Sequence, residues 1–460
     1  MEANTKMRDM TQGSPAKHIF LFSLPLLLGN VLQQLYNMVD SWTVGNFTGD
    51  TALAAVGIAF PVVFLFVSLF IGLGIGSTVV IAQFYGAGET ERVRAAIDTA
   101  YAAFLIVAIP ISLAAFFLTD PILYLLQVEE AALPEARLYL QIVSLGLVGS
   151  IGYNTNAGIL QGLGNSKTPL MFLSIAMGIN IVLDLLFVAV FRWGVAGVAF
   201  ATIIAQWFSW IFGIFYINRM YSEFHLHLRG LHIDRSLLRQ IVRIGLPAGI
   251  QNGLIAAAIM ALMARVNLYG TDFTAGFNVG NKVDCFAFLP VQSLANAATT
   301  YVGQNVGAGR MDRVRQGTRA TLAMGVVWCF AIAAVLMPLS RPIMLLFSKT
   351  PAVVDAGVLY LWWVLPFYAL FAIQFVLNNV MRGAGDAVFP MISSLISVVV
   401  VRVVLCYVIS DAFGQQYMFA CYAGAWLVGV ILSGGYFLLG RWKRFGSMAA
   451  AENRMREKEP

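Results

Sequence analysis

Long apolar segments alternate with short polar ones along almost the whole chain. Twelve apolar runs are each long enough for a membrane-spanning helix, which needs about 20 mainly apolar residues. Because they are continuous and do not alternate every second residue, they favour helices and exclude a membrane β-barrel. They lie at roughly residues 18–42, 53–80, 95–118, 138–160, 168–190, 195–217, 240–265, 275–302, 318–338, 357–380, 388–409 and 418–440. We predict an all-α polytopic membrane protein with twelve transmembrane helices.

Composition agrees with this pattern. Of 460 residues, 59% are apolar and only 11% are charged, whereas soluble domains carry about 25% charged residues. A soluble enzyme, a disordered scaffold and a disulfide-stapled secreted module are therefore excluded. The four cysteines are isolated and form no CxxC pair, so we interpret them as small buried side chains.

The distribution of Lys and Arg predicts the orientation. With the N-terminus placed in the cytoplasm, 22 of the 29 basic residues fall on the cytoplasmic side and only four on the outer side. This bias obeys the positive-inside rule and puts both termini in the cytoplasm. The net charge of +6 is therefore explained by cytoplasmic loops, and we expect no nucleic-acid partner.

An internal repeat recurs at an offset of about 221 residues. The stretch QFYGAGETERVR at 83–94 returns as QNVGAGRMDRVR at 304–315, with seven of twelve positions identical. Leu24-Pro25 with Asn30 likewise matches Leu246-Pro247 with Asn252. Several landmarks at one offset indicate a duplicated unit.

Each repeat holds six spans, so the two halves share one orientation and form parallel repeats. We expect two six-helix lobes with a V-shaped cleft, in which substrate binds and is exposed alternately to each side as the lobes rock. The predicted divisions are an N-terminal lobe at 1–217, a cytoplasmic linker at 218–239, a C-terminal lobe at 240–440 and a cytoplasmic tail at 441–460.

Acids within the spans are few, and they differ between the halves. Only Asp40, Asp184 and Asp284 lie well inside apolar runs, where ionisable groups are costly and usually functional. The repeat offset places Asp40 on Ala261 or Leu262 and Asp184 on a leucine, so this acid pair belongs to the N-terminal half alone.

These two acids have polar neighbours at helical spacing. Tyr36 and Asp40 are i, i+4 neighbours, as are Asn180 and Asp184, and Thr202 lies at a similar depth in the sixth span. We predict one pocket containing all five. Two poorly solvated carboxylates cannot both stay ionised without a cation, so a proton or a sodium ion would bind there. The alternative is a structural hydrogen bond between helices.

Other features of the first, seventh and eighth spans are less specific. Pro25 predicts a helix kink, which either bends with occupancy of the site or is static. Lys282 and Asp284 either face the cleft and meet substrate or pair with other helices. The candidate substrate-cleft residues are Asn30, Gln33, Gln251, Asn252, Lys282 and Asp284.

Taken together, these motifs resemble the multidrug and toxic compound extrusion (MATE) family over about residues 15 to 440. The resemblance rests on Leu24-Pro25 through Asn37-Met-Val-Asp40, the two QxxGAG turns, and the spacing of Asn180, Asp184 and Thr202; it is to the DinF-like and MepA-like bacterial branch. It implies an antiporter of the bacterial cytoplasmic membrane that exports small organic, often cationic, compounds in exchange for H⁺ or Na⁺. It also implies that Asp40, Asn180, Asp184, Thr202 and Tyr36 form the ion-coupling site.

The sequence is also compatible with two other functions. A lipid-linked oligosaccharide flippase could share the two-lobed architecture but should line its cleft with several cations. A membrane-embedded enzyme needs a metal or nucleophile constellation, and none of the four histidines lies deep in a span. We therefore expect no enzymatic activity, no cofactor, no metal beyond Na⁺ at Asp40 and Asp184, and a protein that functions as a monomer in the lipid bilayer.

Overall fold

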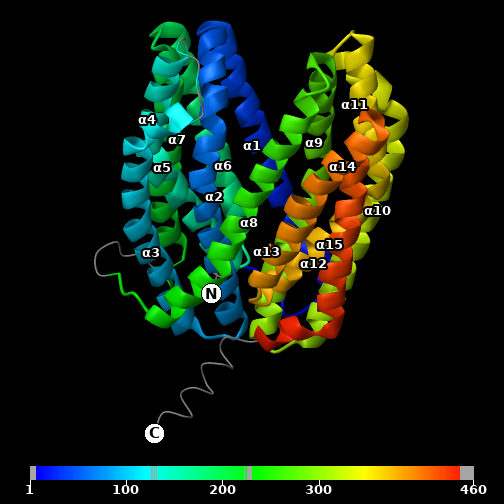
Figure 1. Cartoon of the computed structure of the whole chain (residues 1–460). Coiled ribbons are helices and arrows are strands. Elements are labelled where there is room, and N and C mark those ends of the chain that lie inside the picture. The colour runs from blue at the N-terminus through cyan, green and yellow to red at the C-terminus, as the bar shows by residue number, and fades with distance from the viewer. Residues whose placement is uncertain are drawn as a thin grey trace. The chain divides into compact units, whose positions relative to one another are not determined.

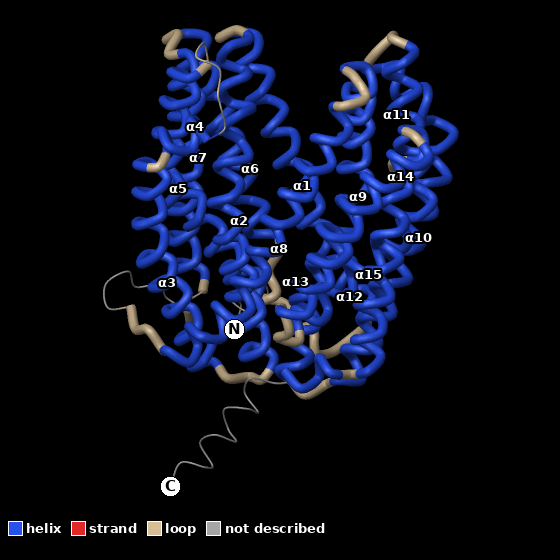
Figure 2. Tube along the Cα trace, in the orientation of Figure 1, coloured by secondary structure: helices blue, strands red, loops and turns tan. Residues whose placement is uncertain are grey.

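The structure is a computed structural model that describes residues 7–125, 128, 130, 132–221, 223–224 and 231–445. Within this part of the chain every regular element is a helix (Figures 1 and 2). Each of the twelve predicted spans falls on a helical segment to within two residues. Ten of these segments are by themselves long and apolar enough to cross a membrane; the other two, α5 and α9, are less apolar.

The first half of the chain contains six long helical segments and one short outer helix. These are α1 (Pro15–Phe47), α2 (Asp50–Gly86), α3 (Thr90–Phe117), the short α4 (Thr119–Leu125), α5 (Leu133–Gly162), α6 (Lys167–Asp184) with its π-helical continuation η2 (Leu185–Val190), and α7 (Gly194–Met220).

The second half repeats this order with more interruptions. Its elements are α8 (Arg235–Asn267), α9 (Thr271–Gly307), α10 (Met311–Phe347), α11 (Pro351–Val364), η3 (Leu365–Phe367), α12 (Tyr368–Gly383), α13 (Val388–Ser394), the π-helix η4 (Leu395–Val401), α14 (Arg402–Phe413), η5 (Gln415–Tyr417), α15 (Ala420–Leu439) and η6 (Arg441–Phe445).

The repeated QxxGAG motif forms the same turn in both halves. It ends α2 and α9, and the last glycine of each motif takes a positive φ, +76° at Gly88 and +71° at Gly309. Only glycine adopts this region readily, which explains its presence at both sites. The internal repeat of the sequence is therefore also a repeat of backbone conformation.

The helices form two compact units whose boundaries lie inside α1 and α8. Unit 1 comprises Met1–Asp9 and Leu28–Gly249, and unit 2 comprises Met10–Leu27 and Ile250–Pro460. The first helix of each repeat therefore begins in one unit and ends in the other. Both boundaries fall shortly after a proline within the helix, Pro25 in α1 and Pro247 in α8. Proline removes a backbone hydrogen bond and is a common cause of kinks.

Within unit 1, the beginning of α8 packs closely against α2. A Cβ atom built on Gly72 would lie 2.3 Å from the carbonyl oxygen of Gly245, and one on Gly76 would lie 2.3 Å from that of Ile241. The two backbones therefore approach as closely as small residues allow, as is common between helices in membranes.

The chain leading into this part of α8 is held by an ion pair with α3. Arg92 Nη1 lies 2.9 Å from Asp234 Oδ2. Asp234 also caps α8, because its Oδ1 accepts hydrogen bonds from the backbone N–H groups of Ser236 and Leu237. The linker is thus anchored where it enters the helix.

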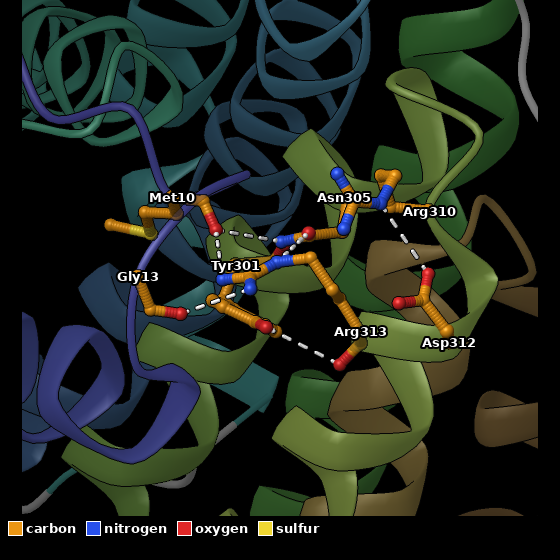
Figure 3. Close-up of polar contacts among 7 residues, drawn as sticks. All are labelled: Met10, Gly13, Tyr301, Asn305, Arg310, Asp312 and Arg313. Atoms are coloured by element: carbon orange, nitrogen blue, oxygen red, sulfur yellow. Dashed lines mark hydrogen bonds and ion pairs between the residues drawn. The ribbon is translucent and has the colours of Figure 1, made fainter.

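Within unit 2, the chain leading into α1 is held at the equivalent place (Figure 3). Arg313 Nη1 donates to the carbonyl of Gly13 at 2.9 Å and Nη2 donates to that of Met10 at 3.1 Å. Asn305 accepts from Arg313 Nε at 3.0 Å and donates to the Met10 carbonyl. At the repeat offset Arg313 corresponds to Arg92. Each repeat therefore uses the same arginine to anchor the segment that precedes a first helix.

Candidate functional site

The five residues predicted to form one pocket lie together in unit 1. Tyr36 and Asp40 come from α1, Asn180 and Asp184 from the last two turns of α6, and Thr202 from α7. The Tyr36 hydroxyl donates to Thr202 Oγ1 at 3.2 Å, which joins the first and third of these helices.

Asn180 connects the two acids. With its side-chain nitrogen facing the carboxylates, it donates to Asp40 Oδ1 at 3.1 Å and to Asp184 Oδ2 at 3.0 Å. Asn180 and Asp184 are both 0% exposed, whereas Asp40 is half-buried. One neutral amide thus serves both acids through its two N–H groups.

The two carboxyl groups also act on each other electrostatically. Two ionised carboxylates in one poorly solvated place repel one another, so binding of a proton or another cation is favoured. The remaining oxygen of Asp184, Oδ1, is buried and has no hydrogen-bond partner among the described residues. Within the described chain, no Lys or Arg side chain interacts electrostatically with either carboxyl group. A bound cation is therefore needed if both are to be charged.

The donor set of this pocket suits a proton or a small hard cation. Its oxygens are two carboxylates, an amide carbonyl and a hydroxyl, which are ligands that hard cations prefer. The described residues contain no cluster of three or more His, Cys, Asp or Glu side chains that could hold a transition metal. If the Asn180 amide is turned so that its oxygen faces the two acids, a sodium ion would be held by Asp40, Asp184, Asn180 and Thr202.

The backbone beside the pocket departs from regular α-helix. Directly after Asp184 the chain continues as the π-helix η2. Single π-helical turns are rare and frequently lie at functional sites.

Tyr139 is a member of this site that the sequence did not reveal. Its side chain, on α5, interacts electrostatically with both Asp40 and Asp184. A tyrosine in an apolar run is usually a core residue, so the position of Tyr139 by itself did not indicate a functional role. The internal repeat could have indicated one, since the residue 221 positions later is also a tyrosine, Tyr360.

The candidate cleft residues of α1 and α8 have different environments. Gln33 is exposed, and Asn30 and Asn252 are half-buried. Gln251 is buried in unit 2, where it accepts a hydrogen bond from Arg382 Nη2 and donates one to Ser394 Oγ, each at 2.6 Å.

The two charged candidates on α9 face different surroundings. Lys282 is exposed. Asp284 Oδ2 accepts a hydrogen bond from the Tyr360 hydroxyl on α11 at 2.9 Å. Asp284 therefore forms a hydrogen bond with another helix of its own unit.

Comparisons with known proteins agree with these features. The family model described as MatE matches two equally long stretches, residues 25–186 and 247–408. The chain is 33% identical over 438 residues to the probable multidrug resistance protein YpnP of Bacillus subtilis (strain 168), covering 95% of this chain and 98% of that protein. It is 29% identical over 433 residues to the probable multidrug resistance protein YoeA of the same organism, covering 92% and 93%.

Solved structures share the fold. The outward-facing conformation of a multidrug resistance MATE family transporter of the MOP superfamily superposes with a TM-score of 0.88 at 22% identity, covering 96% of this chain and 99% of that one. The twelve-helix, two-lobed fold predicted from the sequence is confirmed. The match of the family model to most of both halves, together with a relative that is one-third identical along nearly the whole chain, shows that this protein belongs to the MATE family of membrane transporters.

Proposed function

We propose that this chain is a multidrug efflux antiporter that exports small organic, often cationic, compounds in exchange for H⁺ or Na⁺. The coupling ion binds at Asp40 and Asp184 in unit 1. The observation that carries the proposal is the pair of carboxyl groups bridged by the buried Asn180. The names of the relatives YpnP and YoeA support the substrate class.

Coupling follows from the charge of this pocket. Without a bound cation, the two acids repel one another in a poorly solvated place, and with one they are neutralised. Binding of an ion that enters from outside therefore changes the relative free energies of two kinds of state. In one, α1 and α6 hold the two acids close together, and in the other they hold them apart. Pro25 lies about four turns before Asp40 on the same helix and lets α1 bend as the site fills and empties.

The protein acts in the bacterial cytoplasmic membrane with both termini in the cytoplasm. The excess of Lys and Arg in alternate loops supports this orientation. Since the proposed ion pocket lies wholly within one chain, a monomer suffices for function.

The buried cations of the C-terminal half give little support to a flippase. Arg265 forms an ion pair with Asp411, and Arg402 lies over the Tyr422 ring. Both arginines are therefore already engaged with groups of the protein. The transporter assignment of the family likewise favours a carrier over an enzyme.

Gradient-driven transport in proteoliposomes tests the proposal. The full-length protein is reconstituted, and efflux of a fluorescent organic cation such as ethidium is followed with an imposed pH gradient or an imposed sodium gradient. We expect one gradient to drive transport in the unmodified protein, which identifies the ion. Asp40→Asn and Asp184→Asn should each reduce gradient-driven transport about tenfold or more, because a neutral amide cannot exchange the ion.

The matched control is Asp272→Asn, at an exposed aspartate in the first turn of α9. This variant should transport like the unmodified protein. Melting temperatures in detergent show whether each variant is folded. Undiminished gradient-driven transport by folded Asp40→Asn and Asp184→Asn variants would overturn the site assignment.

A further inference from the structure

Unit 2 contains a half-buried aspartate whose carboxyl group has an incomplete set of partners. Asp284 on α9 accepts one hydrogen bond at Oδ2, from the Tyr360 hydroxyl at 2.9 Å. Its other carboxyl oxygen, Oδ1, is buried and has no hydrogen-bond partner among the described residues. The hydroxyl of Tyr368 donates to the Asp284 backbone carbonyl and leaves the side chain unaffected.

A buried arginine in the same unit is also incompletely satisfied. Arg402, the first residue of α14 after the π-helix η4, is only 6% exposed. Its guanidinium carbon lies 4.5 Å from the centroid of the Tyr422 ring, and its Nε has no hydrogen-bond partner within the described chain. Arg402 acts electrostatically on Asp284, yet no ion pair between them is formed in this structure.

Close-packed aromatic rings surround Tyr360, the hydrogen-bond partner of the carboxyl group. The Tyr360 ring is fully buried and lies 5.7 Å from Tyr422, 5.2 Å from Phe277 and 5.1 Å from Phe419, centroid to centroid. A proton requires no volume, so it can bind at Oδ1 without displacing any of these rings. The positive charge of Arg402 disfavours a sodium ion, which also needs several oxygen ligands.

The repeat gives this group a counterpart in unit 1. Tyr360 lies 221 positions after Tyr139, which interacts electrostatically with Asp40 and Asp184. In each unit, a tyrosine at this repeat position therefore accompanies a carboxyl group within a helical span, although the acids themselves come from different helices.

We propose that Asp284 is a second proton-binding site, located in unit 2, and that Arg402 balances its charge when the proton leaves. With the proton bound, the neutral carboxyl group stays with Tyr360 and Arg402 stays over Tyr422. When the O–H bond breaks, the proton passes to water, the electron pair stays on the carboxylate, and Arg402 turns toward it to form an ion pair. This site is additional to the proposed coupling site at Asp40 and Asp184.

Few other groups near Asp284 can titrate or carry charge. Two of these groups, Lys282 and Cys285, lie on the same helix as Asp284 and are exposed. The others lie on neighbouring helices. The surrounding groups are Tyr360 on α11, Tyr368 on α12, Arg402 and Cys406 on α14, Cys421 and Tyr422 on α15, and Cys329 on α10. Arg402 is permanently charged and acts on Asp284, so it is the group that can compensate a carboxylate there, whereas Arg265 on α8 is paired with Asp411.

Infrared difference spectroscopy of the full-length protein in lipid tests this proposal directly. Spectra are recorded between acidic and alkaline pH, where a protonated carboxyl group gives a C=O stretching band. We expect one band to be lost in Asp284→Asn and retained in Asp40→Asn, Asp184→Asn and the exposed control Asp272→Asn. Tyr360→Phe keeps the ring but removes the hydrogen bond to Oδ2, so it should shift the frequency of the same band.

Transport supplies a second and independent measurement. Asp284→Asn should lower the number of protons moved per organic cation, measured with a pH-sensitive dye. Carboxyl bands unchanged in both Asp284→Asn and Tyr360→Phe would overturn the proposal. Displacement of the band by sodium at constant pH would also overturn it, since the site would then bind a metal ion. Because the bands of Asp40 and Asp184 are recorded separately, failure here is distinguishable from failure of the proposed coupling site.

Discussion

The single amide group of Asn180 forms hydrogen bonds with two acids. It is fully buried and donates both N–H groups, one to Asp40 and one to Asp184. Removal of a donor from a buried acceptor costs about 1–3 kcal/mol, and more when the acceptor is charged. The amide therefore limits how far the two helices that carry the acids can separate.

We predict that Asn180→Ala lowers the thermal stability of the detergent-solubilised protein by an amount equivalent to about 1–3 kcal/mol. In the double variant Asn180→Ala with Asp184→Asn the two effects should not add, because both remove the same interaction. Melting curves of the four proteins form a double-mutant cycle that measures this coupling. Additive effects would show that the amide does not bridge the acids.

Sequence reasoning identified most of this site but not all of it. Asp40 and Asp184 were found because acids in apolar spans are rare and because the other repeat lacks them. Helical spacing then added Tyr36 and Asn180. Tyr139 was missed, since a tyrosine in an apolar span has no distinguishing pattern. The partners of Asp284 could not be predicted, because they come from helices far along the chain.

At the scale of helices, the contact between α2 and α8 depends on glycine. Gly72 leaves no room for a Cβ atom because the carbonyl oxygen of Gly245 would lie 2.3 Å from it. Gly57 lies on the same helix, and a Cβ atom added there would have no other atom within 4 Å, so it provides a matched control.

We predict that Gly72→Ala destabilises the protein by about 1–3 kcal/mol because it forces the two helices apart. Gly57→Ala should be neutral or slightly stabilising, since alanine favours the helix and meets no obstacle. Thermal melting in detergent compares the two. Equal melting temperatures for the two variants would contradict the close packing.

The two anchors that precede α1 and α8 should respond differently to pH. Burial alone would raise the pKa of Asp234, but the backbone N–H groups of Leu237 and Ser236 and the Arg92 guanidinium together lower it. Its stabilising effect is therefore complete above the unfolded-state pKa of about 3.9 and is lost as the pH falls through the lower folded-state value. The Arg313 anchor binds backbone carbonyls, which do not titrate.

We predict that Asp234→Asn is less stable than the unmodified protein at pH 7 and that the difference shrinks below about pH 4. At neutral pH the loss should be about 1 kcal/mol or less, because the pair is partly solvated. Arg313→Gln should lower stability equally at both pH values. A difference for Asp234→Asn that stays constant on acidification would contradict the ion pair.

At the scale of the whole molecule, the sequence predicted the number, order and repeat of the helices. Those features depend on local hydropathy and on comparison of the chain with itself. The ends of the helices were harder to predict from the sequence. The helices α2 and α9 each extend over 37 residues, well beyond their apolar runs. The π-helices and the unit boundaries inside α1 and α8 were not predicted, because they depend on packing between distant segments.

The location of those boundaries bears on how such a protein could arise. Each unit is completed by the opening turns of a helix that the sequence assigns to the other repeat. Two identical subunits that exchange an end segment form a domain-swapped dimer. A single repeat would therefore have needed a second copy to cover its core. Joining two copies into one gene makes that exchange intramolecular and leaves each repeat free to acquire its own acids.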